Sequence, residues 1–552
     1  MTQSRSREDA IKQDIADLHQ LGYAQELFRS MGGFSNFAIS FSIISILTGA
    51  VILYDYGLAW AGTAAVMIGW PLITVFVLFI SASMAEIASA YPTAGGLYYW
   101  ASRMKNKNWG WWTAWLNLLG QFAIVAGINW AAAGFLNATI IDRIIGSEFN
   151  TTEIIPGIIN GQLVTMGILM LIELAMNIAG INLVAILNQV SVWWHIVIVA
   201  AVVLFIFLTG KPDQSGLTLF AIQPQDAGGS WNNNLGFVNL QYGAATTYPL
   251  ILAFFFSLLQ ANWTYTGYDA SAHVAEETVS ARVASAWGLF LSVAVSAVVG
   301  FIFLVALTTH LPDLKTLFPN PLPTDLGQAS QYYFGGGFAV VDILEYNLGQ
   351  LGDVLAAGIA IAMAFCGLSS VASAGRMLYA FSRDDGLPGS RWLKKVSHRY
   401  RTPANSLTAM VIIAWLFSAA AFAVGTGTAV IIITAVSTIF LYAAYGIVIY
   451  LGATTQEWLK IRVWSLGRWS KPIAWISIAW VLVLMVLFSF PTSGNISWPF
   501  MFVTVVLLVV YYFASARRTF QGPRSMGEAA DLTEIEREFE HAAEELGGPQ
   551  TA

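Results

Sequence analysis

The stretch QVSVWWHIVIVAAVVLFIFLT, residues 189–209, contains no aspartate, glutamate, lysine or arginine. A helix of roughly 20 predominantly apolar residues is long enough to cross a bilayer core of about 30 Å. Comparable stretches occur on both sides of it, which predicts an all-α membrane protein of about twelve transmembrane helices. The predicted spans are residues 34–54, 63–86, 111–138, 158–178, 189–209, 248–272, 285–308, 352–381, 405–424, 428–452, 473–491 and 499–515.

The overall composition agrees with this fold class. Hydrophobic residues make up 57% of the 552 positions and charged residues 11%, whereas soluble domains are about a quarter charged. This excludes a soluble enzyme that carries a single membrane anchor. Cys366 is the only cysteine, so an internal disulfide and a cysteine-based metal cluster are excluded. Because the sequence also lacks metal-ligand spacing, an acid dyad and an ATP-binding segment, we expect no enzymatic activity, no cofactor or metal, and no nucleic acid partner.

The distribution of basic residues predicts the orientation in the membrane. Cytoplasmic loops of membrane proteins carry an excess of lysine and arginine. If the N-terminal tail, residues 1–33, is cytoplasmic, only Arg143, Lys211 and Lys315 of the 26 basic residues lie outside. The first 30 residues are polar and charged, which suits a cytoplasmic tail and not a cleavable signal peptide. We therefore expect a multi-pass protein of the inner cell membrane with both termini in the cytoplasm.

Three hydrophilic segments interrupt the pattern of apolar spans. Residues 210–247 and 309–350 are predicted to be external loops. The C-terminal tail, residues 516–552, carries acidic residues at helix-compatible spacing between positions 526 and 548. Acidic side chains at such spacing are typical of a solvent-exposed helix, so we expect a solvated cytoplasmic helix in this tail.

Three ordered motifs make the sequence similar to a known transporter family. MAEIASAYPTAGGLYYW (84–100) resembles the signature at the end of the second span in the amino acid–polyamine–organocation superfamily. GYDASAHVAEET (267–278) resembles the exit of its sixth span, and RMLYAFSRDDGLP (376–388) resembles the segment after its eighth span. The motifs are closest to the amino acid/choline transporter branch, which includes GABA, choline and amino acid permeases.

The resemblance implies a LeuT-like fold of two inverted five-helix repeats, residues 34–209 and 248–452, followed by two peripheral helices within 473–515. The transporter domain would extend over residues 34–515, with spans 1 and 6 broken in mid-membrane. The implied function is secondary active import of a small amino acid or amine, such as GABA or choline, by alternating access. A non-transporting receptor or sensor on the same permease fold is the alternative. The expected partners are a small-molecule substrate and the lipid bilayer, and the sequence contains no indication of the oligomeric state.

The breaks in spans 1 and 6 are the expected substrate site. Non-helical backbone is tolerated at membrane depth where it lines a cavity, and its free N–H and C=O groups bind charged substrate groups. By comparison with the superfamily, the span-1 break falls at residues 47–49, although Leu47 replaces the usual glycine. Trp263 offers an aromatic face for a cation, and Gly267 provides the backbone freedom that a break needs. The predicted substrate-binding residues are Ser45, Thr48, Gly49, Trp263, Thr264, Tyr265, Thr266 and Gly267.

His195 is the predicted site of ion coupling. Asn188, Ser191 and His195 lie at positions i, i+3 and i+7 and therefore share one face of span 5. Ionisable groups within a membrane span are functional candidates by default, and histidine titrates close to physiological pH. By resemblance, His195 stands near the span-5 lysine of proton-coupled members of the superfamily. A neutral histidine held by one structural hydrogen bond is the alternative.

Ser369 and Ser370 in span 8 support a competing hypothesis of sodium coupling. They stand about where related sodium-coupled folds supply two hydroxyls to a sodium site that span-1 carbonyls complete. Hydroxyls and carbonyls suit a hard cation, but no carboxylate accompanies them. If His195 points into the same pocket, its proton would take the place of sodium. We therefore favour a proton over sodium as the coupling cation.

Charged residues near the cytoplasmic ends of the spans are predicted to form an inward gate. Ion pairs between these helices would open and close as the spans move, whereas exposed pairs contribute little stability. Within span 6, Asp269 could bind an ammonium group or pair near this gate, and Asn117 and Gln121 of span 3 could reach the pocket. The predicted gating residues are Glu86, Glu276, Glu277, Arg376 and Arg383, with Asp384 beside them.

Overall fold

The computed structural model describes residues 7–212, 215–222, 237–242, 244–312, 338–424, 429–489 and 497–545. Parts of the predicted loops 210–247 and 309–350 lie outside these residues. Within those loops, the described residues include a β-hairpin of β3 (Phe237–Tyr242) and β4 (Ala244–Pro249) and a helix, α17 (Phe338–Leu348). The second predicted loop is therefore shorter than expected, because its last residues are helical.

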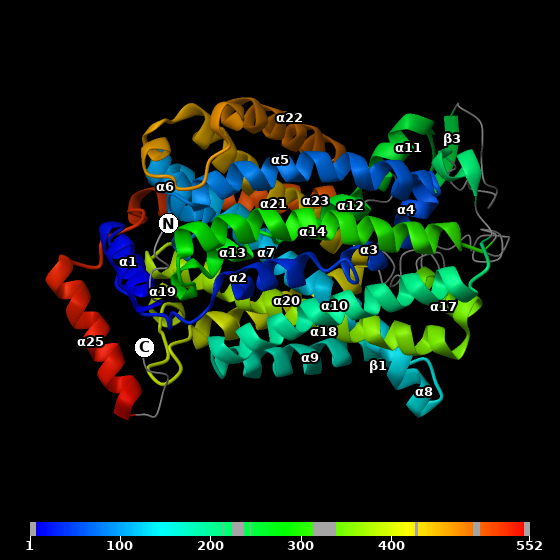
Figure 1. Cartoon of the computed structure of the whole chain (residues 1–552), viewed down its shortest axis with the longest axis horizontal. Coiled ribbons are helices and arrows are strands. Elements are labelled where there is room, and N and C mark those ends of the chain that lie inside the picture. Colours follow the sequence, from blue (N-terminus) through cyan, green and yellow to red (C-terminus); the bar gives the residue numbers. More distant parts are fainter. Residues whose placement is uncertain are drawn as a thin grey trace, which may run out of the picture.

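Long apolar helices run side by side through the molecule (Figure 1). Among the described residues, eleven helices are long and apolar enough to cross a membrane, so the predicted all-α membrane fold is confirmed. Ten of them contain the uninterrupted helices α5 (Trp70–Ala88), α7 (Lys107–Leu136), α9 (Gly161–Ile178), α10 (Ile181–Thr209), α14 (Ala281–Thr309), α18 (Gln350–Arg383), α20 (Ala404–Val424), α21 (Ala429–Thr454), α22 (Ser470–Ser489) and α23 (Ser497–Tyr511).

Two of the twelve predicted spans are built from short helices. The first span consists of α2 (Gly33–Ile44), α3 (Gly49–Ile52) and α4 (Tyr54–Ala61). The sixth consists of α11 (Leu250–Ser257), α12 (Leu259–Thr264) and α13 (Ala270–His273), so it is not among the eleven long helices. Both spans are interrupted, and the inverted repeat that would relate them stays a prediction.

Short elements connect and cover the long helices. Helix α6 (Leu97–Met104) follows the glycine-rich end of the second span, and α8 (Asp142–Ile145) follows the third span. The other short elements lie at the two ends of the bundle and are α1 (Arg7–Gln20), β1 (Glu153–Ile155), β2 (Ile159–Asn160), α19 (Ser390–Leu393) and α25 (Ala529–Glu545).

The packing separates central from peripheral helices. Helix α7 lies at the centre and packs against α18, α20, α21 and α9, and α2 packs against α14 and α10. In the most apolar part of α21, 83% of the residues are buried. In the span that contains α23, only 22% are buried. The last helix therefore lies at the edge, where an apolar surface can face lipid.

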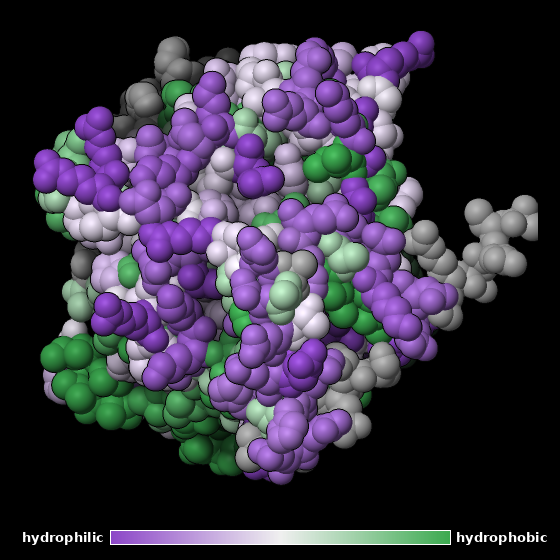
Figure 2. All heavy atoms as spheres, turned by 90° about the vertical axis from the view of Figure 1, so that its left-hand side faces the viewer, coloured by the Kyte–Doolittle hydropathy of each residue, from purple (hydrophilic) through white to green (hydrophobic). Residues whose placement is uncertain are grey.

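Both chain termini lie at the same end of the bundle, which we call the terminal end (Figure 1). Figure 2 shows this end face covered largely by hydrophilic side chains, with hydrophobic residues along one margin. The helix α1 and the C-terminal helix α25 both lie on it. A polar end face above apolar helix flanks is what a multi-pass membrane protein requires.

The C-terminal tail forms a helix as predicted, but this helix is docked and not simply solvated. Leu532, Glu536 and Phe539 share one face of α25. Glu536 Oε1 lies 2.8 Å from His19 Nε2 and accepts a hydrogen bond from the backbone N–H of Gln25 at 2.8 Å. The ring of Phe539 stacks on that of His398 at 5.0 Å between centroids. The tail thus joins the N-terminal segment to the loop after α18, because one face of α25 is partly apolar.

Replacing Phe539 with alanine is expected to release α25 from the terminal end. Burying a phenylalanine side chain contributes about 1.5–3 kcal/mol, so cleavage by trypsin after Arg537 should become roughly ten- to hundredfold faster. Limited proteolysis of the purified full-length protein measures this. Glu534→Ala, on an exposed position of the same helix, is the control and should leave the cleavage rate unchanged. Equal rates for Phe539→Ala and wild type would contradict the docked arrangement.

Candidate functional site

The interruption of the first span lies between α2 and α3, at residues 45–48. Ser45 has a φ of 28°, which places its backbone in the left-handed region that few side chains adopt. The backbone N–H groups of Thr48 and Gly49 donate to the Ser45 carbonyl at 2.7 and 2.9 Å, so the chain makes a tight turn before it becomes helical again. The predicted break at residues 47–49 overlaps this turn.

The interruption of the sixth span lies between α12 and α13, at residues 265–269. Gly267 has a φ of +82°, a conformation that glycine adopts without steric cost. A Cβ atom there would lie 2.4 Å from Ile43 Cγ2, and one on Gly49 would lie 2.6 Å from Thr264 Cα. The two interruptions are therefore in close contact, and two glycines make that contact possible.

A very small cavity of about 10 Å³ lies between the two interrupted spans. A cavity of this size holds about one water molecule at most, so the space between the two interruptions is closed in this conformation. Helix α7 contributes an apolar wall, and the interrupted spans contribute hydroxyls and backbone. The lining residues are Ile43, Ile44, Thr48, Gly49, Ile124, Ile128, Trp263, Thr264 and Thr266.

Five of the eight predicted substrate-binding residues line this cavity, and three lie beside it. Gly267 contacts Ile43 and Ile124 from outside the lining. The Tyr265 hydroxyl lies 2.7 Å from Thr74 Oγ1, which directs this side chain toward α5. The Ser45 hydroxyl faces α10, where it lies 2.8 Å from His195 Nε2. The five lining residues are Thr48, Gly49, Trp263, Thr264 and Thr266.

Trp263 is held in position by a residue that the sequence analysis did not identify. Its indole N–H donates to Ser437 Oγ of α21 at 2.9 Å. A Cβ atom on Gly127 would lie 3.1 Å from Trp263 Cζ2, so the ring packs on the backbone of α7. The indole face is thereby fixed at the cavity, where a cation or an apolar substrate group could stack on it.

His195 connects α10 to the interruption of the first span. Its Nδ1 lies 2.7 Å from the Ser191 carbonyl oxygen, which can only accept, so Nδ1 carries a proton. Its Nε2 lies 2.8 Å from Ser45 Oγ, and Ser45 Oγ lies 2.7 Å from Thr48 Oγ1. A chain of hydroxyls thus leads from His195 to a residue that lines the cavity, and Nε2 is the ring atom that could accept a proton.

The two serines of the sodium hypothesis donate their hydroxyl hydrogen bonds to groups of α10 and α18. Ser369 Oγ donates to Asn188 Oδ1 at 2.5 Å and lies 2.8 Å from the Phe365 carbonyl. Ser370 Oγ donates to the Gly367 carbonyl at 2.8 Å. From the same helix, Cys366 Sγ reaches the Ile43 carbonyl of the first span at 3.2 Å. In the described residues, the cysteine and not a serine hydroxyl makes the hydrogen bond from α18 to the first span.

Asp269 is the last residue of the sixth-span interruption, on the side of the terminal end, and its carboxylate is enclosed by donors. Asn117 Nδ2 and Gln121 Nε2 of α7 donate to Oδ2 at 2.9 and 3.3 Å, and His273 Nε2 lies 3.2 Å from it. The Tyr445 hydroxyl of α21 donates to Oδ1 at 2.8 Å. Asp269 is thus paired within the protein. Tyr445 could not be found from the sequence, because one tyrosine among twenty carries no signal of its partner.

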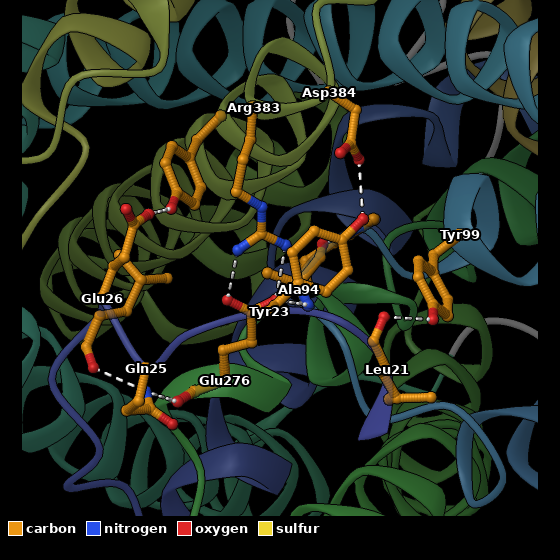
Figure 3. A network of polar contacts seen from close by, with 12 residues as sticks. Leu21, Tyr23, Gln25, Glu26, Ala94, Tyr99, Glu276, Arg383 and Asp384 are labelled. Carbon is orange, nitrogen blue, oxygen red and sulfur yellow. Dashed lines mark hydrogen bonds and ion pairs between the residues drawn. The ribbon is translucent and has the colours of Figure 1, made fainter. Parts of the chain in front are cut away.

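Two buried ion pairs close the terminal end below the cavity. Arg376 donates to both oxygens of Glu277, at 2.6 and 3.0 Å. Arg383 donates to both oxygens of Glu276, at 2.9 and 3.0 Å, and its guanidinium lies 3.9 Å from the Tyr23 ring centroid (Figure 3). These four residues link the exit of the sixth span to α18.

Glu86 belongs to a different cluster. Its Oε1 accepts from Arg462 at 2.5 Å, from the Leu466 backbone N–H at 2.7 Å and from Ser470 Oγ at 2.8 Å. These partners lie in the connection between α21 and α22. Of the five predicted gating residues, four therefore pair with one another, and Glu86 anchors a neighbouring loop.

The N-terminal segment before α2 fills the space around the ion pairs. The Tyr23 hydroxyl donates to Asp384 Oδ2 at 2.9 Å (Figure 3). The Tyr98 hydroxyl donates to the same oxygen at 2.9 Å, and Gln25 Nε2 donates to the Glu276 carbonyl at 2.8 Å. Burial raises the pKa of Asp384, and the neighbouring Arg383 guanidinium opposes that shift. The terminal end is closed by packing as well as by charge.

Two interrupted helices that face each other across a small closed cavity, inside a bundle of membrane-spanning helices, define a membrane transporter. The family profile described as amino acid permease matches residues 31–511, and the chain belongs to this family. The predicted membership in the amino acid–polyamine–organocation superfamily is thereby confirmed. Its members carry solutes and are not enzymes.

Relatives match the chain over nearly its whole length. It is 32% identical to "Amino-acid permease BAT1" of Arabidopsis thaliana, over 92% of this chain and 96% of that protein. It is 27% identical to a "Putative polyamine transporter" of Candida albicans, over 95% and 91% of the two chains. It is 25% identical to the "GABA-specific permease" of Saccharomyces cerevisiae, over 94% and 87%.

Proposed function

We propose that this protein is a secondary active transporter that imports a small amino acid or amine across the inner cell membrane by alternating access. The observation that carries the proposal is the cavity between the two helix interruptions, lined by Thr48, Gly49, Trp263 and Thr266. Backbone N–H groups freed at such interruptions favour a carboxylate, and freed carbonyls favour an ammonium group. The names of the relatives, which include an amino-acid permease, a putative polyamine transporter and a GABA-specific permease, fit this range of substrates.

The terminal end is proposed to face the cytoplasm. Most basic residues fall on that side when the predicted spans are followed, in agreement with the positive-inside rule. The buried pairs Glu276–Arg383 and Glu277–Arg376 then form the inner gate, which is closed in this conformation. Release of substrate to the cytoplasm requires these pairs to separate as the sixth span moves against α18.

Uptake into proteoliposomes tests the proposal directly. The purified protein is reconstituted and offered labelled amino acids, GABA, choline and polyamines, with cold competitors for each. We expect saturable uptake of at least one of these compounds. Specific binding without flux would contradict transport and support the alternative of a receptor on a permease fold.

Replacing His195 with alanine is expected to abolish accumulation driven by a pH gradient while sparing exchange of substrate across the membrane. The reason is that His195 Nε2 is the proton acceptor joined to the cavity through Ser45 and Thr48. The ratio of internal to external substrate, with and without the gradient, measures the effect. Replacing external sodium with potassium is the parallel control. Unchanged concentrative uptake in the variant, or uptake that needs sodium, would remove His195 from the mechanism.

A further inference from the structure

Glu173 is a buried carboxyl group of α9 that the site described above does not use. Only 2% of the residue is exposed, and α9 packs against α7, α18 and α20. A Cβ atom on Gly367, near the middle of α18, would lie 2.1 Å from Glu173 Oε1 and 2.8 Å from Asn129 Oδ1. The absence of a side chain at Gly367 therefore leaves room for two oxygen atoms that converge from α9 and α7.

The atoms that meet around Glu173 are hydrogen-bond acceptors without donors. Within the described part of the chain, Glu173 Oε1, Glu173 Oε2 and Asn129 Oδ1 have no hydrogen-bond partner of ordinary geometry. Leaving a buried polar atom unpaired is unfavourable, and leaving an ionised carboxylate unpaired is far more so. Such a cluster calls for a donor that the chain itself does not supply.

The orientation of the two amides strengthens this conclusion. Asn129 Nδ2 donates to the Val125 carbonyl at 3.1 Å, and Asn177 Nδ2 donates to the Glu173 and Leu368 carbonyls at 3.0 and 3.1 Å. Turning either amide over would place its oxygen against a carbonyl oxygen. The Asn129 oxygen therefore stays directed toward Gly367 and Glu173, where it needs a donor.

We propose that Glu173 is a proton-binding site and that it carries a proton, as a neutral carboxylic acid, in the closed conformation described here. A protonated carboxyl group has one O–H donor, and Asn129 Oδ1 is the acceptor directed toward it across Gly367. One bound proton thus removes the unpaired charge and supplies the missing donor. No covalent bond to carbon changes, since the proton comes from water and returns to water.

The residue next to Gly367 connects this part of α18 to the first span. Cys366 Sγ donates to the Ile43 carbonyl, just before the first-span interruption, at 3.2 Å. The other titratable side chain on this route is His195 of α10. Helix α20 has no titratable residue, and Lys107 lies at the far end of α7. No basic side chain of these helices is placed to neutralise Glu173, so a proton is the available counter-charge.

The role of this proton rests on the proposed transport function, because a proton bound at Glu173 would travel with the substrate. Movement of α9 against α18 during the transport cycle would open the acceptor cluster to water and release the proton. Protonation of Glu173 itself does not depend on transport, and it can therefore be tested without a substrate.

Infrared difference spectroscopy of the purified full-length protein at neutral pH tests the proposal. We expect a carbonyl stretch of a buried protonated carboxylic acid that shifts in heavy water and is lost in Glu173→Gln. Glutamine keeps the size of the side chain and can donate to Asn129 Oδ1, so the variant should fold. Glu153→Gln makes the same chemical change at an exposed position of β1 and should keep the band.

A second variant covers the case in which Glu173→Gln does not fold. Asn129→Leu removes the acceptor, so the band should persist but shift as the acid loses its hydrogen bond. If wild type and Glu173→Gln have the same spectrum in the acid region, or if Asn129→Leu leaves the band unmoved, the proposal is wrong. Failure of uptake for every compound tested would instead refute the transport function and leave this result standing.

Discussion

Replacing Arg376 with methionine is expected to destabilise the folded protein by about 3–5 kcal/mol, because the change leaves the Glu277 carboxylate buried without its partner. Both residues of this pair are almost completely buried, at 0% and 1% side-chain exposure. The gain from the methionine side chain is small beside the cost of an unpaired charge. Unfolding of the purified protein in mixed detergent micelles, followed by tryptophan fluorescence, measures the free-energy difference.

Two further variants decide whether the ion pair is the cause. In Arg376→Met combined with Glu277→Gln, no charge remains unpaired, so a large part of the stability should return. Arg143→Met removes two ion pairs, with Glu345 and Asp353, at the opposite end of the bundle, where the arginine side chain is 46% exposed. Exposed pairs contribute about 0–1 kcal/mol, so this control should change little. A double variant as unstable as Arg376→Met would show that the guanidinium acts by some route other than Glu277.

Replacing Gly267 with alanine is the second change with a large expected effect. Any other residue at a φ of +82° costs about 1–2 kcal/mol. The new Cβ would also lie 2.4 Å from Ile43 Cγ2, and such overpacking typically costs about 1–3 kcal/mol. We therefore expect a loss of about 2–5 kcal/mol in stability and a loss of substrate uptake, because the two interruptions can no longer meet.

Gly146→Ala separates backbone strain from the steric clash. Gly146 has a φ of +71°, and a Cβ there would meet no atom within 4 Å. This variant should lose only the backbone contribution of about 1–2 kcal/mol and should retain uptake. If Gly267→Ala behaves like Gly146→Ala in both measurements, the close approach of the first and sixth spans is not required for transport.

The sequence supports much of the fold, because the signals for it are local. Apolar stretches such as residues 189–209 are long enough to span a bilayer, and their number requires no knowledge of packing. The motif at 376–388 and the acidic pair at 276–277 predict charged partners near one membrane face. The pairing Glu276–Arg383 was accessible in this way, whereas the partners of Glu86 were not, since they lie in a connection without a distinctive pattern.

The site is less accessible from the sequence, because it depends on contacts between distant helices. Trp263 and Thr48 could be proposed from their place in the interrupted spans. The direction of the Tyr265 side chain toward Thr74 and the enclosure of Asp269 by Tyr445 could not, since helical spacing does not specify which neighbour a side chain meets. Glu173 is a clear case. In the sequence it is a single charged residue within an apolar span, and only its unpaired oxygens in the structure indicate a proton-binding site.

The amino-acid sequence by itself determined that the chain crosses the membrane about twelve times and belongs to a transporter family. Both follow from the length, hydrophobicity and order of local segments. The tertiary structure alone decided that His195 meets Ser45, that α25 docks through Phe539, and that oxygens of Glu173 and Asn129 converge at Gly367 without hydrogen-bond partners. Burial and unpaired charge are properties of assembled helices, because a side chain loses its water only when other helices close around it.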